Sequence, residues 1–207
     1  MRLNTDITST AAAVHEWVKN IPPGTIFFLQ DIQVEGSDAA IRKIAAQLVK
    51  EKVIMRIAKG IYVYPKKDPL LGTLKPSLED VANAIARRDN IRLQPTSALA
   101  LNKLGLSTQI PMKQVYYTDG TQRIIAIGKG TIMFKQRSPR RVAQKSYLVA
   151  LVIAAIEELR MDGLTVEIKE KLKDTLAQEE KKAIQEDVLT APAWVRTIIK
   201  ELIKEHK

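Results

Sequence analysis

The stretch SDAAIRKIAAQLVKEKVIMRIAKGIYVYP, residues 37–65, decides the fold. Ser37 is a good helix N-cap, and apolar residues recur at helical spacing from residue 38 to about residue 51. Two short apolar runs follow, at residues 53–57 and 61–64, joined by a turn that contains a glycine. This pattern is typical of a β-hairpin, so the stretch predicts an amphipathic helix followed by two antiparallel strands.

The residues before this stretch supply the other elements of a small domain. A helix capped by Ser9 or Thr10 is expected to end before two consecutive prolines, and residues 25–28 form a short β-rich run. Residues 29–33 are long enough for a brief second helix. The resulting order of helix, strand, helix, turn, helix and hairpin is typical of a winged helix-turn-helix.

In that fold the third helix enters the major groove of DNA and the hairpin contacts the backbone or the minor groove. Arg42 could donate two hydrogen bonds to a guanine, whereas Arg56 and Lys59 would contact phosphates. We therefore predict that the DNA-binding residues are Ser37, Asp38, Ala39, Ala40, Arg42, Lys43, Gln47, Arg56 and Lys59. Two alternatives stay open, because winged helices also serve as protein–protein modules and basic residues beside an apolar stripe are often only a solvated helix face.

A second region begins after a proline- and glycine-containing segment, residues 68–75, that is predicted to be a linker. Ser77 is expected to cap one helix, and residues 96–104 are expected to form another. Three strand-like runs follow, and Asp119-Gly120 between the first two is a strong hairpin signal. Residues 128–131 superficially resemble a phosphate loop but are better interpreted as a hairpin turn.

Residues 68–145 carry thirteen basic and five acidic residues, which makes them the most positive part of a chain whose net charge is +10. Six cations could form a surface that attracts nucleic acid or an acidic partner. They are Arg123, Lys129, Lys135, Arg137, Arg140 and Arg141. Ordinary solubilising charge is an equally good explanation, because excess charge attracts without identifying the partner.

The last sixty residues have more acidic than basic residues and four helical patterns. The first is strongly apolar, residues 147–159, and Pro192 opens the last. We expect a helical cap on the second domain; a dimer or partner surface around Trp194 and Ile198 is the alternative. The predicted class is thus α+β, with a winged helix-turn-helix at 1–67, a linker at 68–75 and a basic α/β domain at 76–207, mixed to about residue 140 and helical from about 146.

Composition argues against several functions. The chain has no cysteine, which excludes disulfides and thiol catalysis and fits a reducing, cytoplasmic setting. Its two histidines, His15 and His206, lack a metal-ligand partner at helical spacing, and no D-x-D pair of the kind used in two-metal chemistry occurs. No apolar run is long enough to cross a bilayer, and no signal peptide is expected. We therefore expect a protein without catalysis, cofactor, metal or membrane partner.

Several motifs together carry a family resemblance. They are RIAKGIYVYP at 56–65, QPTSALALNKLGLSTQIP at 94–111, YTDG at 117–120 and IMFK at 132–135. Over about residues 10 to 140 the chain resembles the AbiEi family of antitoxins, which belong to type IV toxin–antitoxin systems of bacterial abortive infection, a phage defence.

This resemblance implies that the N-terminal domain binds double-stranded DNA, at inverted repeats in its own promoter, and represses the operon. It also implies that the C-terminal part counters a nucleotidyltransferase-like toxin without a stable complex. One winged helix contacts a single half-site. Two protomers are therefore expected on each palindrome, where they could form a dimer. Two rival functions stay open. One is an enzyme that acts on nucleic acid or nucleotides through the basic second domain, which loss of turnover on mutating Asp119 or Glu79 would support; the other is an interaction module that blocks the toxin directly.

Overall fold

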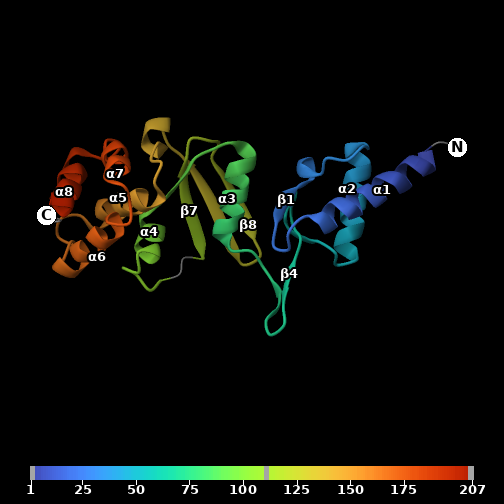
Figure 1. Cartoon of the computed structure of the whole chain (residues 1–207), viewed down its shortest axis with the longest axis horizontal. Helices are drawn as coiled ribbons and strands as arrows, with labels where there is room; N and C mark the ends of the chain where they lie inside the picture. The colour runs from blue at the N-terminus through green and yellow to red at the C-terminus, as the bar shows by residue number, and fades with distance from the viewer. Residues whose placement is uncertain (1–2, 110–111, 205–207) are drawn as a thin grey trace. The chain divides into compact units, whose positions relative to one another are not determined.

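Helices and short sheets alternate along the chain, which is an α+β protein in the computed structural model (Figure 1). The structure describes residues 3–109 and 112–204, with side chains from Thr10 onward; His206 and two residues of the 94–111 motif lie outside the described residues. Contacts divide the chain into two units, Met1–Ile85 with Ala126–Gly128, and Ala86–Ile125 with Lys129–Lys207. This division falls within a helix, Leu78–Asp89. The domain limits inferred from the sequence stay predictions.

The first unit contains a three-stranded antiparallel sheet in the order β1-β3-β2. The elements in chain order are α1 (Leu3–Asn20), β1 (Ile26–Phe28), the 3-10 turn η1 (Leu29–Asp31), α2 (Asp38–Lys50), β2 (Met55–Ala58), β3 (Ile61–Val63), β4 (Lys66–Asp68), β5 (Gly72–Leu74) and the first part of α3 (Leu78–Asp89). The predicted helix after Ser37 and the predicted hairpin are both confirmed. The brief second helix is only a single 3-10 turn.

The first helix starts earlier than the sequence predicts. α1 begins at Leu3, so neither Ser9 nor Thr10 caps it. No proline or glycine interrupts residues 3–9, so the helix continues through them. The Thr10 hydroxyl instead donates a hydrogen bond to the Glu35 carbonyl oxygen at 3.0 Å, which ties α1 to the turn before α2.

Aromatic packing fixes α1 against the sheet. Trp17 meets Phe27 edge to face, with ring centroids 5.2 Å apart, and Phe27 stacks on Tyr62 at 5.8 Å. Val14 and Val18 of α1 are buried in the same cluster as the apolar stripe of α2. The buried stripe thereby decides which residues of α2 remain exposed.

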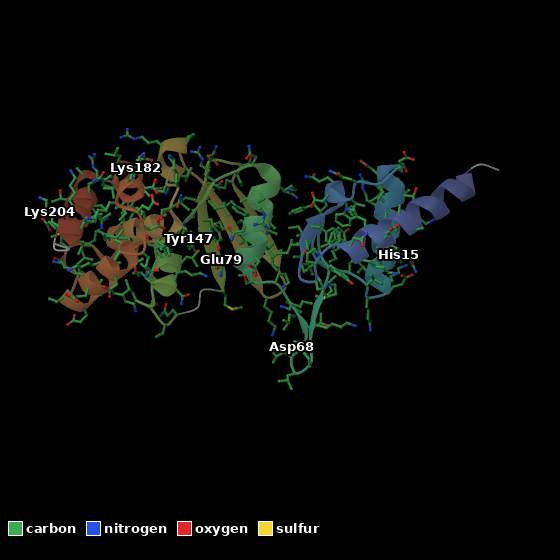
Figure 2. All side chains as sticks on the ribbon, viewed as in Figure 1. His15, Asp68, Glu79, Tyr147, Lys182 and Lys204 are labelled. Carbon is green, nitrogen blue, oxygen red and sulfur yellow. The ribbon has the colours of Figure 1, made fainter. Side chains whose placement is uncertain are left out.

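The segment 68–75, predicted to be a linker, contributes to a two-stranded antiparallel sheet of β4 and β5. The Asp68 carboxylate accepts hydrogen bonds from the backbone N–H groups of Leu70 at 2.8 Å and Leu71 at 2.9 Å. These bonds, from Leu71 and then Leu70, hold the pKa of Asp68 below its ordinary value. Figure 2 labels Asp68 on this hairpin. Pro69 and Gly72 indicate a break in this segment, and the local turn made by Asp68 forms a hairpin there.

The second unit holds most of a mixed four-stranded sheet in the order β6-β7-β9-β8, whose strand β8 ends in residues grouped with the first unit. β7 runs antiparallel to β6 and parallel to β9. Its elements after α3 are β6 (Leu93–Pro95), α4 (Ser97–Lys103), β7 (Lys113–Thr118), β8 (Arg123–Ile127), β9 (Gly130–Gln136), the 3-10 turn η2 (Pro139–Val142), α5 (Tyr147–Leu159), α6 (Val166–Leu176), α7 (Lys181–Val188) and α8 (Ala193–Lys204).

The hairpin expected at Asp119-Gly120 is wrong, because β7 pairs with β9 and not with β8. The Asp119 carboxylate accepts a hydrogen bond from the Arg92 backbone N–H at 2.8 Å. A Cβ on Gly120 would lie 2.6 Å from Cγ2 of Ile91, so the glycine allows a close approach. The turn predicted at residues 128–131 does join neighbouring strands, and Gly128 has a φ of +58°.

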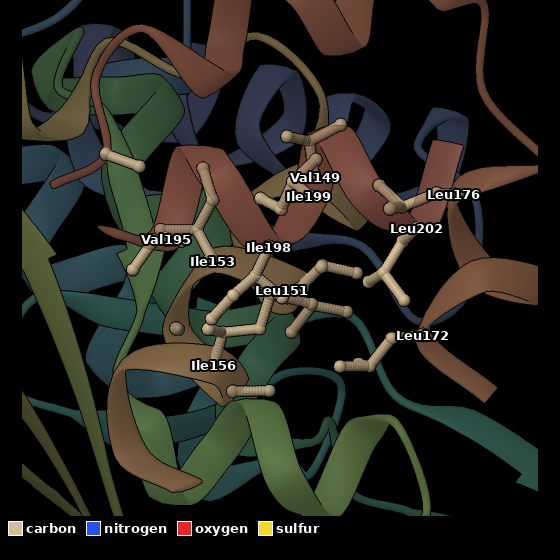
Figure 3. Packing of buried hydrophobic residues seen from close by; sticks show 14 of the residues in the cluster. Val149, Leu151, Ile153, Ile156, Leu172, Leu176, Val195, Ile198, Ile199 and Leu202 are labelled. Carbon is tan, nitrogen blue, oxygen red and sulfur yellow. The ribbon is translucent and has the colours of Figure 1, made fainter. Parts of the chain in front are cut away.

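The helical patterns of the tail are confirmed as α5 to α8. The apolar helix α5 is buried among its neighbours, as Figure 3 shows for Val149, Leu151, Ile153 and Ile156. Ile198 of α8 lies in this cluster, and Trp194 packs against it half-buried, so the apolar stripe of α8 is used within the unit. Among the residues described, no helix has both the length and the apolarity needed to cross a membrane.

Candidate nucleic-acid interface

Helix α2 presents most of the predicted DNA-binding residues to solvent. The Ser37 hydroxyl accepts a hydrogen bond from the Ala40 backbone N–H at 3.2 Å, so this side chain caps the helix. Ile41, Ile44 and Leu48 are buried on the core side. The predicted DNA-binding residues of this segment are exposed, except for the half-buried Ala40: Ser37, Asp38, Ala39, Arg42, Lys43 and Gln47.

The charged side chains on this face make only weak contacts with each other. The closest approach of Arg42 to Asp38 is 3.9 Å between Nη2 and Oδ2, and their side chains are 69% and 91% exposed. An exposed pair of this kind stabilises a protein by about 0.2–1 kcal/mol, and an anionic ligand can displace it at little cost. Gln47 donates to the Glu51 carboxylate at 2.7 Å. The guanidinium of Arg42 is therefore accessible to a further acceptor.

The β2–β3 hairpin carries the remaining two predicted contacts. Arg56 is exposed on β2, and its Nε donates to the Ala58 carbonyl oxygen at 3.3 Å. The register between β2 and β3 shifts between Arg56 and Ala58. Lys59 is exposed in the turn. All nine predicted DNA-binding residues thus lie on α2, its cap and this hairpin, within one unit.

The six cations of the predicted basic surface are spread along β8, β9 and the residues that follow β9. Lys129 lies in the turn before β9, whereas Lys135 lies near the opposite end of that strand. At a rise of about 3.3 Å per residue, the two Cα atoms are about 20 Å apart. Arg137, Arg140 and Arg141 follow the end of β9 and are exposed.

Arg123 is not a free surface cation. Its guanidinium pairs with the Asp89 carboxylate, which also pairs with Arg88 Nε at 2.6 Å. The guanidinium carbon of Arg123 lies 5.1 Å from the centroid of the Phe134 ring. The hydrogen bond from Arg88, followed by the hydrogen bond and charge of Arg123, holds the pKa of Asp89 below its ordinary value against the opposing effect of burial. The guanidinium of Arg123 therefore makes contacts within the unit, with Asp89 and Phe134.

Sequence reasoning did not single out Asp187, which is only 3% exposed. Its carboxylate accepts hydrogen bonds from the backbone N–H groups of Lys145, at 2.9 Å and 3.0 Å, and Ser146, at 2.7 Å. The surrounding sequence QEDVLT gives no signal for this role, because an acidic residue in a charged helix usually faces solvent. The role of Asp187 is seen only in the folded chain, where residues 145 and 187 lie next to each other.

The residues named for the rival enzyme are not assembled into a metal site. Asp119 accepts the Arg92 backbone hydrogen bond, and Glu79 lies in the first turn of α3, where Figure 2 labels it. Within residues 3–109 and 112–204, no three His, Asp or Glu side chains come together as ligands for a metal. The expectations of no metal and no catalysis stay predictions.

These observations define a two-unit α+β protein whose first unit exposes the face of a capped helix next to a short hairpin. The chain belongs to a family of unknown function, DUF6088, whose model matches residues 13–184. This match includes parts of both units. No curated protein matches the chain.

Proposed function

We propose that the first unit is a winged helix-turn-helix and that the protein is a DNA-binding transcriptional regulator. The observation that carries the proposal is the exposed N-terminal half of α2, where Ala39 is followed by Arg42 and Lys43. A small residue near a helix N-terminus allows close approach to base edges, and arginine and lysine match the acceptors of guanine and phosphate. In this proposal η1 takes the place of the middle helix.

The resemblance to AbiEi antitoxins extends the proposal to partners. The bound DNA would be inverted repeats in the protein's own promoter, with two protomers per palindrome. The second unit would counter a nucleotidyltransferase-like toxin in the cytoplasm without catalysis and without a stable complex. Co-elution of purified protein and toxin at moderate salt would contradict this last part and favour a module that blocks the toxin directly.

The test is fluorescence anisotropy with the DNA upstream of the gene and a scrambled duplex, each at two salt concentrations. Specific regulation predicts tight binding that survives the higher salt only on the upstream DNA. Equal, salt-sensitive binding to both duplexes would reduce the interaction to general electrostatic attraction and overturn the proposal.

Arg42→Ala separates base reading from charge. We expect it to weaken binding to the upstream DNA by about 1–3 kcal/mol while binding to scrambled duplex falls only slightly. Lys19→Ala is the matched control, because it removes one positive charge from an exposed position at the end of α1 in the same unit. If Arg42→Ala weakens both duplexes equally, then Arg42 contacts phosphate and not a base.

A further inference from the structure

A cavity of about 390 Å³ lies within the second unit. It is formed by β6, β7, η2, α5 and the turn between α7 and α8. The lining residues that matter here are Gln94, Tyr117, Arg137, Arg141, Gln144 and Glu157. The volume is within the range of small-molecule sites, which extends from about 300 to about 1,000 Å³.

Two guanidinium groups line this cavity. Arg137 lies over the Tyr117 ring, with 4.6 Å between the guanidinium carbon and the ring centroid. Arg141 Nη1 lies 3.4 Å from Glu157 Oε1, in a pair that is open to solvent. Planar guanidinium groups suit a phosphate, because each can present two parallel N–H donors to its oxygens.

Two buried side-chain acceptors line the same cavity. Gln94 is 8% exposed, and its Nε2 donates to the Gln144 backbone oxygen at 3.0 Å. Gln144 Nε2 donates to Thr190 Oγ1 at 2.6 Å. Among the described residues, neither Gln94 Oε1 nor Gln144 Oε1 has a hydrogen-bond partner, although both atoms are buried. Buried polar atoms are almost always paired. These two unpaired amide oxygens beside the cavity could therefore accept N–H donors of a ligand after a side-chain rotation that exposes them.

Gln144 is held in position by its neighbours. Asp187 accepts hydrogen bonds from the backbone N–H groups of Lys145 and Ser146, the two residues that follow it. The Ser146 hydroxyl in turn accepts from the Val149 backbone N–H and caps α5. The backbone beside Gln144 is therefore fixed just before the start of α5.

We propose that this cavity binds a nucleoside monophosphate. Arg137 and Arg141 would hold the phosphate, and the oxygens of Gln94 and Gln144 would accept hydrogen bonds from the N–H groups of the base. A free amino acid also combines an anion with N–H donors, but it would leave much of the volume empty. The proposal uses no residue of α2 or of the β2–β3 hairpin, so its failure and the failure of DNA binding are distinguishable.

Isothermal titration calorimetry on the full chain tests the proposal, with GMP, AMP, CMP, UMP, inorganic phosphate and glutamate as probes. GMP offers the most N–H donors on one edge and should bind most tightly. Arg141→Gln is expected to raise its Kd at least tenfold. The matched control is Arg140→Gln, which changes the adjacent arginine in η2, an exposed residue outside the cavity lining.

Gln144→Met separates base recognition from phosphate binding. We expect the affinity for GMP to fall about tenfold towards that of inorganic phosphate, while phosphate binding stays unchanged; a melting curve confirms that the variant folds. The proposal is overturned if the wild-type chain binds none of the nucleotides at millimolar concentration, if Arg140→Gln is as harmful as Arg141→Gln, or if phosphate or glutamate binds as tightly as GMP.

Discussion

At the scale of single residues, Asp89 makes the stability of the second unit sensitive to acid. Arg88 and Arg123 hold its pKa below the ordinary value of 3.8. Stability that depends on the charged form is therefore fully present above that value and is lost as the pH falls towards the lower pKa of the folded state. Asp89→Asn should make the free energy of unfolding at neutral pH smaller and its decline below pH 3.8 shallower than in the wild type.

Urea unfolding of both proteins across the acid range measures this difference. Asp80→Asn is a suitable comparison, because Asp80 is an exposed carboxylate of the same helix that interacts with Ser77 rather than with an arginine. A parallel decline in the wild type and in Asp89→Asn would show that the two arginines do not stabilise the charged carboxylate.

Asp187 is the second residue whose loss has a defined cost. Its removal leaves the backbone N–H groups of Lys145 and Ser146 unpaired near the buried start of α5. Since hydrogen bonds to charged groups each contribute about 1.5–3 kcal/mol, Asp187→Ala should lower the free energy of unfolding by about 3 kcal/mol. Asp174→Ala, at an exposed position of α6, should change it by less than about 0.5 kcal/mol. Equal losses in equilibrium unfolding would contradict the role given to Asp187.

At the scale of elements, the connection between β7 and β8 depends on close packing. Gly120 faces Ile91, and an added Cβ would meet Ile91 Cγ2 at 2.6 Å. Gly120→Ala should therefore destabilise the protein by about 1–3 kcal/mol through overpacking. In a double-mutant cycle, Ile91→Ala should relieve part of this cost, so that the combined loss is smaller than the sum. If the two single-mutant losses in stability are strictly additive in thermal unfolding, the cost of Gly120→Ala does not come from contact with Ile91.

The elements themselves were largely predictable, because apolar spacing and capping act locally. Ser37 and the stripe that follows it predict α2, and the apolar run from Tyr147 predicts α5. Strand pairing was not predictable in the same way. Asp119-Gly120 has the composition of a tight hairpin, yet β7 pairs in parallel with β9, a partner that lies beyond β8 in the chain. Pairing depends on the whole sheet and not on the two residues at a turn.

At the scale of the whole molecule, the proposed DNA complex predicts how single cations affect salt dependence. Lys59→Ala should weaken binding to upstream and scrambled DNA alike and reduce the slope of log K against log salt by about 1, because it removes one phosphate contact. Anisotropy titrations at several salt concentrations measure this slope. An unchanged slope would show that Lys59 does not contact a phosphate.

The candidate sites differ in how far the sequence reveals them. The residues on α2 and the hairpin are close in sequence, so helical and strand periodicity show which of them are exposed. The cavity of the second unit joins Gln94 to Gln144 and Gln144 to Thr190, which are far apart in the chain. Arg123 is similar, because its charge alone suggests a surface residue whereas its guanidinium contacts Asp89. Such sites depend on tertiary contacts that a single sequence does not specify.

The strand order has a further consequence for association between molecules. β8 stands at one end of the sheet order, an edge position at which a strand from another copy could pair, and its Ile124 is 63% exposed. Arg123 lies on that same strand with its charge half-buried against Asp89. A charged residue turned inward on an edge strand deters edge-to-edge aggregation, because an incoming strand would have to bury it further. The contact between Arg123 and Asp89 is therefore expected to oppose pairing of β8 with a strand of another copy.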